Sequence, residues 1–266
     1  MAERPRTYTA EGVILRRRNV GEADSIFTVY SDREGKFDAV ARGVRKARSK
    51  MRGHLEPLTR SRFLIAKGRT LDVFAQAETV HHYRVVREDL DRAATALYCA
   101  ELVDRFTVER APQEGLYSLL LGVLDALEDG CGIAVARYFE VQLLALTGYD
   151  LALEACALCG APLSAEETLL SPSAGGLVCR LCRPRAEGGR LLSLRAVKVL
   201  RYARRETLDA FAAVAVSPEL DGELRTGLAL MLRHTLERDL SATRFVEDVR
   251  RLPAAHPPPS PGGSVE

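Results

Sequence analysis

Hydrophobic and polar residues alternate along the first eighty residues with the period of two that is typical of half-buried β-strands. The alternation predicts five strands rich in Val, Ile, Phe and Thr, at residues 12–18, 25–31, 36–44, 59–67 and 70–80. Polar segments such as Asp32–Gly35 and Lys67–Arg69 have the composition of hairpin turns. Five short strands predict a small closed barrel of the OB type, although an SH3-like barrel would show the same alternation.

The period changes to 3.6 from about residue 81, which predicts a helical domain over residues 81–252. Apolar residues recur at helical spacing from Leu116 to Leu127 and again from Leu224 to Leu236, as expected for the buried stripes of amphipathic helices. No Gly-rich phosphate-binding sequence accompanies these stripes, which disfavours a cofactor site. Residues 253–266 are rich in Pro and Gly, and we expect this tail to be disordered.

Four cysteines interrupt the helical pattern with the spacing C-x2-C-x19-C-x2-C: Cys156, Cys159, Cys179 and Cys182. Two CxxC pairs can place four thiolates around one tetrahedral Zn²⁺, which predicts a structural zinc module over about residues 153–190, with a hairpin between the pairs at 168–178. Four thiolate ligands leave no position for a catalytic water. Two disulfides are the alternative, but the chain shows no secretory signal, and thiols stay reduced in a cytosol.

The remaining candidate ligands lie away from these pairs. Cys99 and Cys131 have apolar helical neighbours, and we expect them to be buried as small hydrophobic residues. His54 and the His81–His82 pair are far from the CxxC pairs in sequence and are not needed as ligands. The composition, with 266 residues of which 47% are hydrophobic, is sufficient for about two domains, and no apolar run is long enough to span a bilayer.

Charge is distributed unevenly along the chain. Residues 1–80 carry 17 Lys and Arg against 10 Asp and Glu, and the acid-free segment 42–52, which we call the basic loop, holds the highest density of positive charge. Such density predicts binding of a polyanion, with a solvated loop as the alternative. The candidate contacts in the basic loop are Arg42, Arg45, Lys46, Arg48, Lys50 and Arg52, and weaker candidates in the first strand are Arg16, Arg17 and Arg18.

Two further patterns bear on nucleic-acid binding. Aromatic residues could stack on bases, but their alternation places most of them in the barrel interior: Phe27, Tyr30, Phe37, Phe63 and Phe74. After the CxxC pairs, Ser193 is a plausible N-cap of a helix with one apolar face. Its opposite face is a basic stripe formed by Arg195, Lys198, Arg201 and Arg205. This stripe is a candidate second surface for DNA or a partner, and an ordinary solvated helix face explains it equally well.

The N-terminal segment reads GVILRRRNVGEADSIFTVYSDREGKFDAVARGVRKARSKMRGHLEPLT, with an E-x-D triplet before the second strand, an EGK turn and ARGVRK followed by LEPL. Together with SPSAGGLVCRLC at the second CxxC pair, these motifs resemble the RecO family of DNA repair and recombination mediators. The resemblance spans nearly the whole chain and is most specific at the N-terminus. It implies an α+β protein in which a five-stranded OB-fold barrel, residues 1–80, precedes an α-helical domain carrying an inserted four-cysteine zinc module.

The resemblance also implies a non-enzymatic role. RecO-like proteins bind single- and double-stranded DNA, anneal complementary strands, bind the partner RecR and help to load the recombinase RecA onto DNA coated by single-strand binding protein (SSB). It further implies a cytoplasmic, nucleoid-associated bacterial protein whose helical domain has a groove for the acidic tail of SSB. We expect the stripe from Leu116 to Leu127 and the basic stripe to form that groove. The chain has no Walker A sequence, nucleophile elbow or HExxH motif, which agrees with a non-enzymatic role.

Two other classes of function are open to the sequence. A zinc-dependent nucleic-acid enzyme, such as a deaminase, would need an open metal position and an H-x-E motif, which this chain lacks. An adaptor whose basic barrel docks an acidic protein is a stronger alternative, because positive charge alone does not distinguish phosphate from carboxylate. A DNA titration across salt concentrations separates the two.

Overall fold

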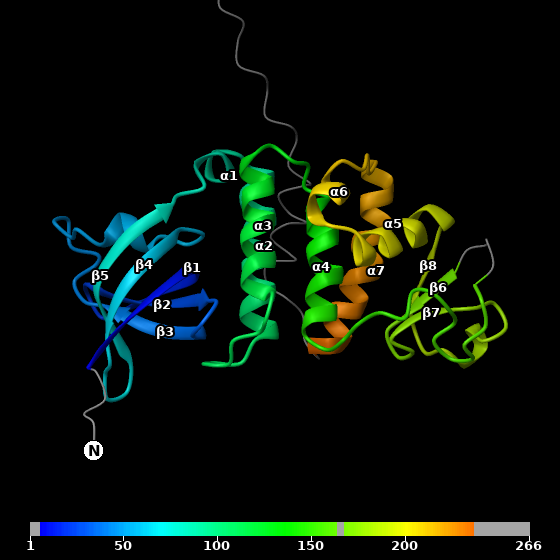
Figure 1. The fold of residues 1–266 in the computed structure, drawn as a ribbon, viewed down its shortest axis with the longest axis horizontal. Coiled ribbons are helices and arrows are strands. Elements are labelled where there is room, and N and C mark those ends of the chain that lie inside the picture. The colour runs from blue at the N-terminus through cyan, green and yellow to red at the C-terminus, as the bar shows by residue number, and fades with distance from the viewer. Residues whose placement is uncertain (1–5, 164–167, 237–266) are drawn as a thin grey trace, which may run out of the picture.

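The computed structural model describes residues 6–163 and 168–236, and the described elements form three parts along the long axis of the molecule (Figure 1). A β-barrel lies at one end, helices fill the middle, and a small sheet that carries the CxxC pairs lies at the other end. The tail that the sequence predicts to be disordered, residues 253–266, lies outside the described residues.

The N-terminal part is a closed five-stranded barrel, as the alternation predicted, with the strand order β1-β2-β3-β5-β4. Its strands are β1 (Thr7–Val20), β2 (Asp24–Ser31), β3 (Gly35–Ala41), β4 (Arg60–Ala66) and β5 (Asp72–His81). Neighbouring strands are antiparallel except β3 and β5, which close the barrel through the parallel pairs Ala39–Asp72 and Val40–Val73.

Two strand boundaries differ from the prediction by three residues or more. β1 begins at Thr7 rather than at residue 12, because its first half pairs with β4 while its second half pairs with β2. Gly12 sits where these pairings overlap, and a Cβ there would lie 2.6 Å from the carbonyl oxygen of Tyr30, so only glycine allows this approach. β3 ends at Ala41 rather than at residue 44, because Gly43 adopts a φ of 64° and its N–H donates to the Asp24 carboxylate at 2.7 Å.

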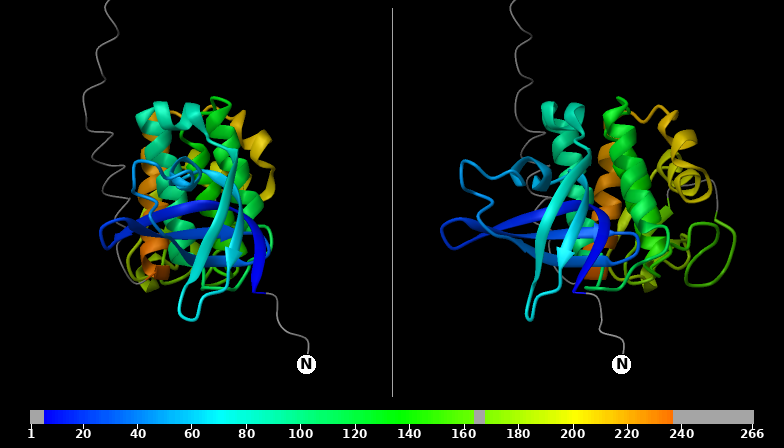
Figure 2. Two further views of the ribbon diagram at one scale, coloured as in Figure 1. Left: turned by 90° about the vertical axis from the view of Figure 1, so that its left-hand side faces the viewer. Right: turned by 60° about the vertical axis from the view of Figure 1, so that its left-hand side comes forward.

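The barrel is buried on two faces. Its interior is filled by the apolar residues of all five strands, and four of the five aromatic residues considered for stacking lie there: Phe27, Phe37, Phe63 and Phe74. The fifth, Tyr30, lies on the outer face of the barrel and belongs to the core of the helical part. Figure 2, in which the barrel faces the viewer, shows the helices behind it. These buried aromatics therefore offer no surface for base stacking.

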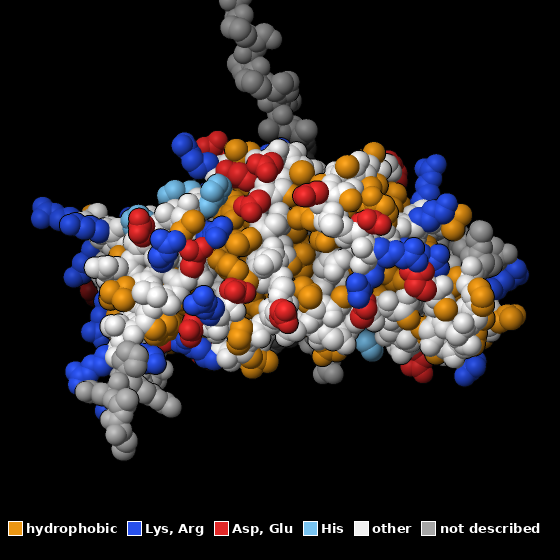
Figure 3. Space-filling view, viewed as in Figure 1, with side chains coloured by type: hydrophobic (Ala, Val, Ile, Leu, Met, Phe, Trp, Pro, Cys, Tyr) orange, Lys and Arg blue, Asp and Glu red, His pale blue; other side chains and the backbone are white. Residues whose placement is uncertain are grey.

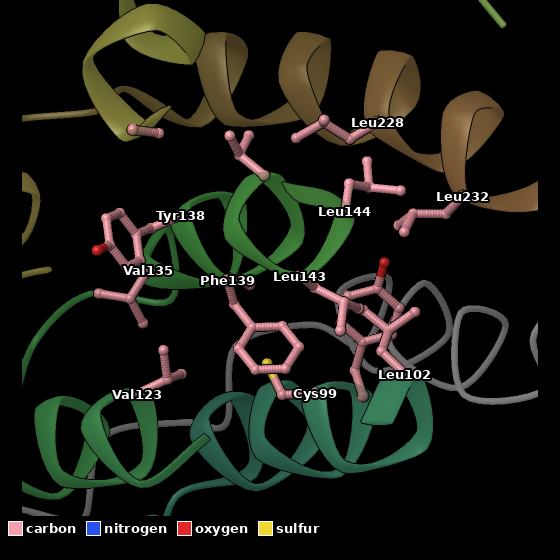
Figure 4. Close-up of a cluster of buried hydrophobic side chains, with 14 of the residues drawn as sticks. Cys99, Leu102, Val123, Val135, Tyr138, Phe139, Leu143, Leu144, Leu228 and Leu232 are labelled. Carbon is pink, nitrogen blue, oxygen red and sulfur yellow. The ribbon is translucent and has the colours of Figure 1, made fainter. Parts of the chain in front are cut away.

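The helical part is built around one central helix. Its helices are α1 (Arg84–Glu88), α2 (Leu90–Phe106), α3 (Leu116–Glu128), α4 (Val135–Leu146), α5 (Leu194–Arg205), α6 (Leu208–Ala212) and α7 (Pro218–Leu236). α4 is buried on every side, as expected for a helix enclosed by others. Phe139 of α4 points toward Cys99 of α2, while Leu144 faces Leu228 of α7 (Figure 4).

The apolar stripe from Leu116 to Leu127 is core rather than surface. Leu120 and Leu124 of α3 are fully buried, and only residues at its margin, such as Leu119 and Leu121, are partly exposed. The expectation that this stripe leaves an apolar groove for a peptide is therefore wrong, because the helices around α4 cover it. Of the two cysteines outside the pairs, Cys99 is buried as predicted, whereas Cys131 is only half-buried.

The third part is an insertion between α4 and α5. β6 (Thr168–Ser171) and β7 (Gly176–Val178) form the predicted hairpin, and β8 (Arg190–Leu192) adds to the other side of β6. α5 begins directly after β8, with the predicted N-cap Ser193 accepting a hydrogen bond from the N–H of Ala196. Short 3-10 turns, η1 (Arg52–Leu55) in the barrel and η2 (Arg183–Arg185) here, complete the structure.

Candidate metal centre and basic surfaces

The two CxxC pairs come together at the end of the molecule opposite the barrel. Their four Sγ atoms all lie within 4.8 Å of one another, and those of Cys159 and Cys179 are 3.8 Å apart. Four sulfurs at about 2.3 Å from one tetrahedral ion would be separated by about 3.8 Å. Each of the four cysteines is a free thiol, which disfavours the disulfide alternative. The donor set and its spacing therefore fit one metal ion.

Backbone turns hold the thiols in place and change their acidity. Loss of hydration acts to raise the pKa of Cys156, but hydrogen bonds from the backbone N–H groups of Cys179, Leu158 and Cys159 outweigh it and lower the pKa to about 6. For Cys182, a hydrogen bond with Cys159 and burial raise the pKa to about 12. A metal ion bound by the four sulfurs would favour the ionised form of Cys182, because a coordinating thiol is deprotonated.

The basic stripe of α5 lies against the segment that leads into the cysteine module. Arg201 Nε donates to the carbonyl oxygen of Leu153 at 2.7 Å, and Arg205 makes two hydrogen bonds, of 3.1 and 2.5 Å, to the Glu154 carboxylate. Arg201 and Arg205 are thus engaged within the molecule and hold residues 153–154 against α5.

Arg204, which the sequence analysis did not identify, adds a further contact of the same kind. It forms a bidentate pair with Asp150 at 2.8 and 2.7 Å, and its hydrogen bonds hold the pKa of Asp150 below its usual value. Arg195 and Lys198 are exposed on α5, and neither forms an ion pair with another described residue. The predicted stripe therefore divides into two engaged residues and two that face solvent.

The basic loop connects β3 to β4 at the free end of the barrel. Val44 within the loop and Leu55 just after it are buried in the barrel core. The exposed charged side chains of the loop are Arg42, Lys46, Arg48, Lys50 and Arg52. Arg45 is half-buried and donates to the carbonyl oxygen of Gly21 at 2.5 Å. Within the described residues, none of the six forms an ion pair, and Figure 3 shows Lys and Arg side chains gathered at this end.

The three arginines of β1 have different surroundings. Arg16 forms an ion pair of 2.8 Å with Asp104 of α2, which joins the barrel to the helices. Arg17 donates to Ser25 Oγ at 3.2 Å and lies over the Phe27 ring. Arg18 is exposed and forms no ion pair with the described residues, so it is the β1 arginine best placed to contact a ligand.

An open groove of about 560 Å³ runs over β4 and β5 beside the basic loop. Lys50, Met51 and His54 line one side of it, and Arg62 and Gln76 of the barrel strands line the other. Arg62 and Gln76 were not predicted, because isolated polar residues on a strand carry no motif. The alternation places Arg62 on the outer face, next to buried Phe63. It does not place Gln76 there, because Gln76 lies two residues after buried Phe74 and becomes exposed only through the register shift between β4 and β5.

In the part of the chain that the structure describes, no helix combines the length and the hydrophobicity needed to cross a membrane.

Two family models match the chain. The model described as Recombination protein O N terminal matches residues 4–83, and the model described as Recombination protein O C terminal matches residues 87–244. The first match covers all five strands of the barrel, and the second covers the helices from α2 to α7 and the cysteine module.

Curated relatives match over nearly their full lengths. A DNA repair protein RecO of Roseiflexus sp. (strain RS-1) is 37% identical over 98% of this chain and 93% of the relative. A protein of the same name from Pelotomaculum thermopropionicum is 38% identical over 93% of this chain and 96% of its own length. A third, from Dehalococcoides mccartyi (strain CBDB1), is 32% identical over 93% of this chain and 98% of its own.

Proposed function

Because the chain belongs to the RecO family of DNA repair proteins, we propose that it is a non-enzymatic mediator of recombinational repair that binds single- and double-stranded DNA and anneals complementary strands. One observation carries the proposal: the basic loop presents five exposed cations without a carboxylate partner among the described residues. Lys and Arg bind DNA by displacing condensed counterions from phosphates, which requires no sequence readout. Annealing also requires binding that is independent of sequence, because the protein must accept any two complementary strands.

The basic loop and the neighbouring groove form the proposed DNA path. Lys46, Arg48 and Lys50 contact phosphates, and the groove beside Lys50 receives an unstacked base or sugar. Arg45 positions the loop through its hydrogen bond to Gly21 rather than contacting DNA directly. Arg18 extends the basic surface along β1.

We propose that the metal held by the four cysteines is Zn²⁺ and that its role is structural. Four thiolates are the donor set that zinc prefers in structural sites, and they leave no coordination position for substrate or water. The residues that would hold it are Cys156, Cys159, Cys179 and Cys182. The ion would supply folding energy to the module and take no part in DNA chemistry.

The proposed partners follow from the family. In this role the protein acts with RecR in the bacterial cytoplasm at the nucleoid, helps to load RecA onto SSB-coated DNA and binds the acidic tail of SSB. Arg195 and Lys198, the solvent-facing half of the α5 stripe, are proposed to attract that tail electrostatically. Arg201 and Arg205 are not proposed, because they already bond to Leu153 and Glu154. A peptide copying the tail should bind the full chain more weakly after Arg195→Glu and Lys198→Glu. Unchanged binding would remove α5 from the tail site.

The DNA-binding proposal is tested by reversing three loop charges, Lys46→Glu, Arg48→Glu and Lys50→Glu, in the full chain. Affinity should fall for every DNA sequence, and the slope of log K against log salt on duplex DNA should become shallower by about 2.7, since each lost phosphate contact removes about 0.9.

The matched control reverses three exposed cations outside the barrel: Arg84, Arg195 and Lys198. It changes the net charge equally and should shift the slope little. A loss confined to one DNA sequence would contradict backbone contact. DNA affinity equal to that of the parent would favour the adaptor whose barrel docks an acidic protein.

A further inference from the structure

We propose that the tip of the cysteine module is a second DNA-binding surface, where Leu181 contacts a base or sugar while Arg180 and Arg185 contact phosphates. This inference rests on the proposed DNA-binding function and extends it from one surface to two. It assigns a role to residues within and just after the second CxxC pair, which the metal site itself does not explain.

The first observation is an apolar side chain held out in solvent. Leu181 is 89% exposed, more than any other large hydrophobic residue in the described part of the chain. Leu158 occupies the same position of the first CxxC pair and is 37% exposed. The turn that carries Leu181 is closed by the Cys182 N–H donating to the Cys179 carbonyl at 3.1 Å. Because this turn is rigid, presenting Leu181 to a ligand costs little conformational entropy.

The second observation is the charge around this side chain. Residues 179–190 contain four arginines and one acid, Glu187. Arg180 and Arg185 are exposed, and neither forms an ion pair with a described residue. Figure 3 shows basic and hydrophobic side chains together at this end of the molecule.

The size of the apolar surface favours DNA over an acidic protein. A stable protein interface buries about 800 Å² on each partner and usually has a well-packed apolar centre. Two leucines cannot supply that area. A single apolar side chain between flanking arginines is sufficient for DNA, because such side chains insert at base steps while the arginines contact the neighbouring phosphates.

The position of the tip indicates which DNA it binds. The basic loop and the cysteine module lie at opposite ends of the long axis, with the helices between them (Figure 1). One short strand bound at the barrel leaves the tip free. The tip therefore holds a second DNA molecule, so that one protein bridges the two.

The test is a two-step capture with the full chain. A single strand is immobilised, the protein is bound to it, and a fluorescent second oligonucleotide is titrated. The Arg180→Glu/Arg185→Glu variant should bind the first strand within about twofold of the parent, whereas capture of the second should weaken at least tenfold at low salt. Its salt slope should become shallower by about 1.4, because each phosphate contact on a single strand contributes about 0.7. Leu181→Ala should weaken capture by about fivefold with an unchanged slope, since it removes apolar contact only.

Two control variants make the result specific to the tip. Arg69→Glu/Arg84→Glu applies the same charge change at two exposed positions outside the cysteine module, and Val108→Ala truncates another exposed apolar residue. Both should capture the second strand as the parent does. Equal loss in the Arg69→Glu/Arg84→Glu variant would show a general charge effect and overturn the tip as a site, as would unchanged capture by Arg180→Glu/Arg185→Glu.

A photo-crosslinker at the tip supplies a readout that does not depend on these charges. Leu181→p-benzoylphenylalanine should crosslink to the second oligonucleotide, and absence of that product would overturn the proposal. Failure of the tip is distinguishable from failure of the proposed function. If the proposed function is wrong, reversal of Lys46, Arg48 and Lys50 leaves binding of the first strand unchanged. If only the tip is wrong, that reversal still weakens binding of the first strand. Zinc content and melting temperature equal to those of the parent show that each tip variant is folded.

Discussion

Replacing Arg137 tests how the core of the helical part is held together, because this residue places a buried charge in the first turn of the central helix, α4. Its side chain is 2% exposed, and it forms ion pairs with Glu140 at 3.1 Å and with Asp221 of α7 at 3.4 Å. Tyr98 of α2 donates to Glu140 at 2.6 Å. Burial and the charge of Glu140 raise the pKa of Tyr98 well above its usual value, so its hydroxyl remains a donor. The cluster thus joins α2, α4 and α7.

Arg137→Met keeps most of the side-chain volume and removes the cation. Glu140, whose side chain is 0% exposed, then stays buried but loses its ion pair with Arg137. Removing one partner of a buried ion pair costs about 3–5 kcal/mol, a large fraction of the roughly 5–15 kcal/mol that stabilises a typical domain. At about 2–4 °C per kcal/mol for a chain of this size, the melting temperature should fall by about 6–20 °C.

The assay is urea unfolding followed by circular dichroism, with thermal melting as a second measure. The matched variant, Arg137→Met with Glu140→Met and Tyr98→Phe, removes the buried carboxylate and its donor as well. It should recover at least half of the lost stability, because apolar replacement of a buried ion pair is often close to neutral. A loss below about 1 kcal/mol in Arg137→Met, or a triple variant as unstable as the single one, would refute the reasoning.

The metal site, one backbone contact and one surface ion pair provide further tests. Cys156→Ser should release Zn²⁺ in a colorimetric assay and lower the melting temperature while DNA binding by the barrel persists, and full zinc content with parental melting would contradict the assignment. Gly35→Ala should lower the free energy of unfolding in urea by about 1–3 kcal/mol, because Gly35 has a φ of 63° and a Cβ there would lie 2.7 Å from the backbone of Ala111. An unchanged free energy of unfolding would show that the backbone around Ala111 moves aside at no cost and would contradict this reasoning. Asp150→Asn should cost less than about 1 kcal/mol at pH 7, because Asp150 and Arg204 are both well exposed. Since pairing lowers the folded-state pKa of Asp150, its contribution is present above the unfolded pKa of about 4 and is lost as the pH falls through the folded value. The stability difference between variant and parent should therefore shrink as the pH falls below about 4.

The barrel was predictable because its signal is local. A half-buried strand shows a period of two wherever it occurs, so the number of strands and most of their residues follow from the alternation. The ends of the strands did not follow, since Thr7 belongs to β1 only because β4 supplies a partner. β3 stops at Ala41 because Gly43 turns away to bond Asp24, which lies 19 positions earlier.

The cysteine cluster was predictable for a similar reason. Each CxxC pair forms a local turn that presents two thiols, and the spacing alone is enough to indicate a shared ion. The state of the arginines on α5 was not predictable, because charge in a sequence does not state whether a carboxylate is within reach. Arg204 and Arg205 meet Asp150 and Glu154 across separations of 54 and 51 residues.

The sequence by itself determined the family, the barrel, the helical period, the two CxxC pairs and the density of charge in the basic loop, since each depends on residues that are neighbours in the chain. Only the tertiary structure decided which of these features remain available to a ligand. It buried the α3 stripe beneath the helices around α4, paired Arg201 and Arg205, and left Leu181 in solvent. Exposure and pairing depend on contacts between distant segments, and such contacts exist only once the chain has folded.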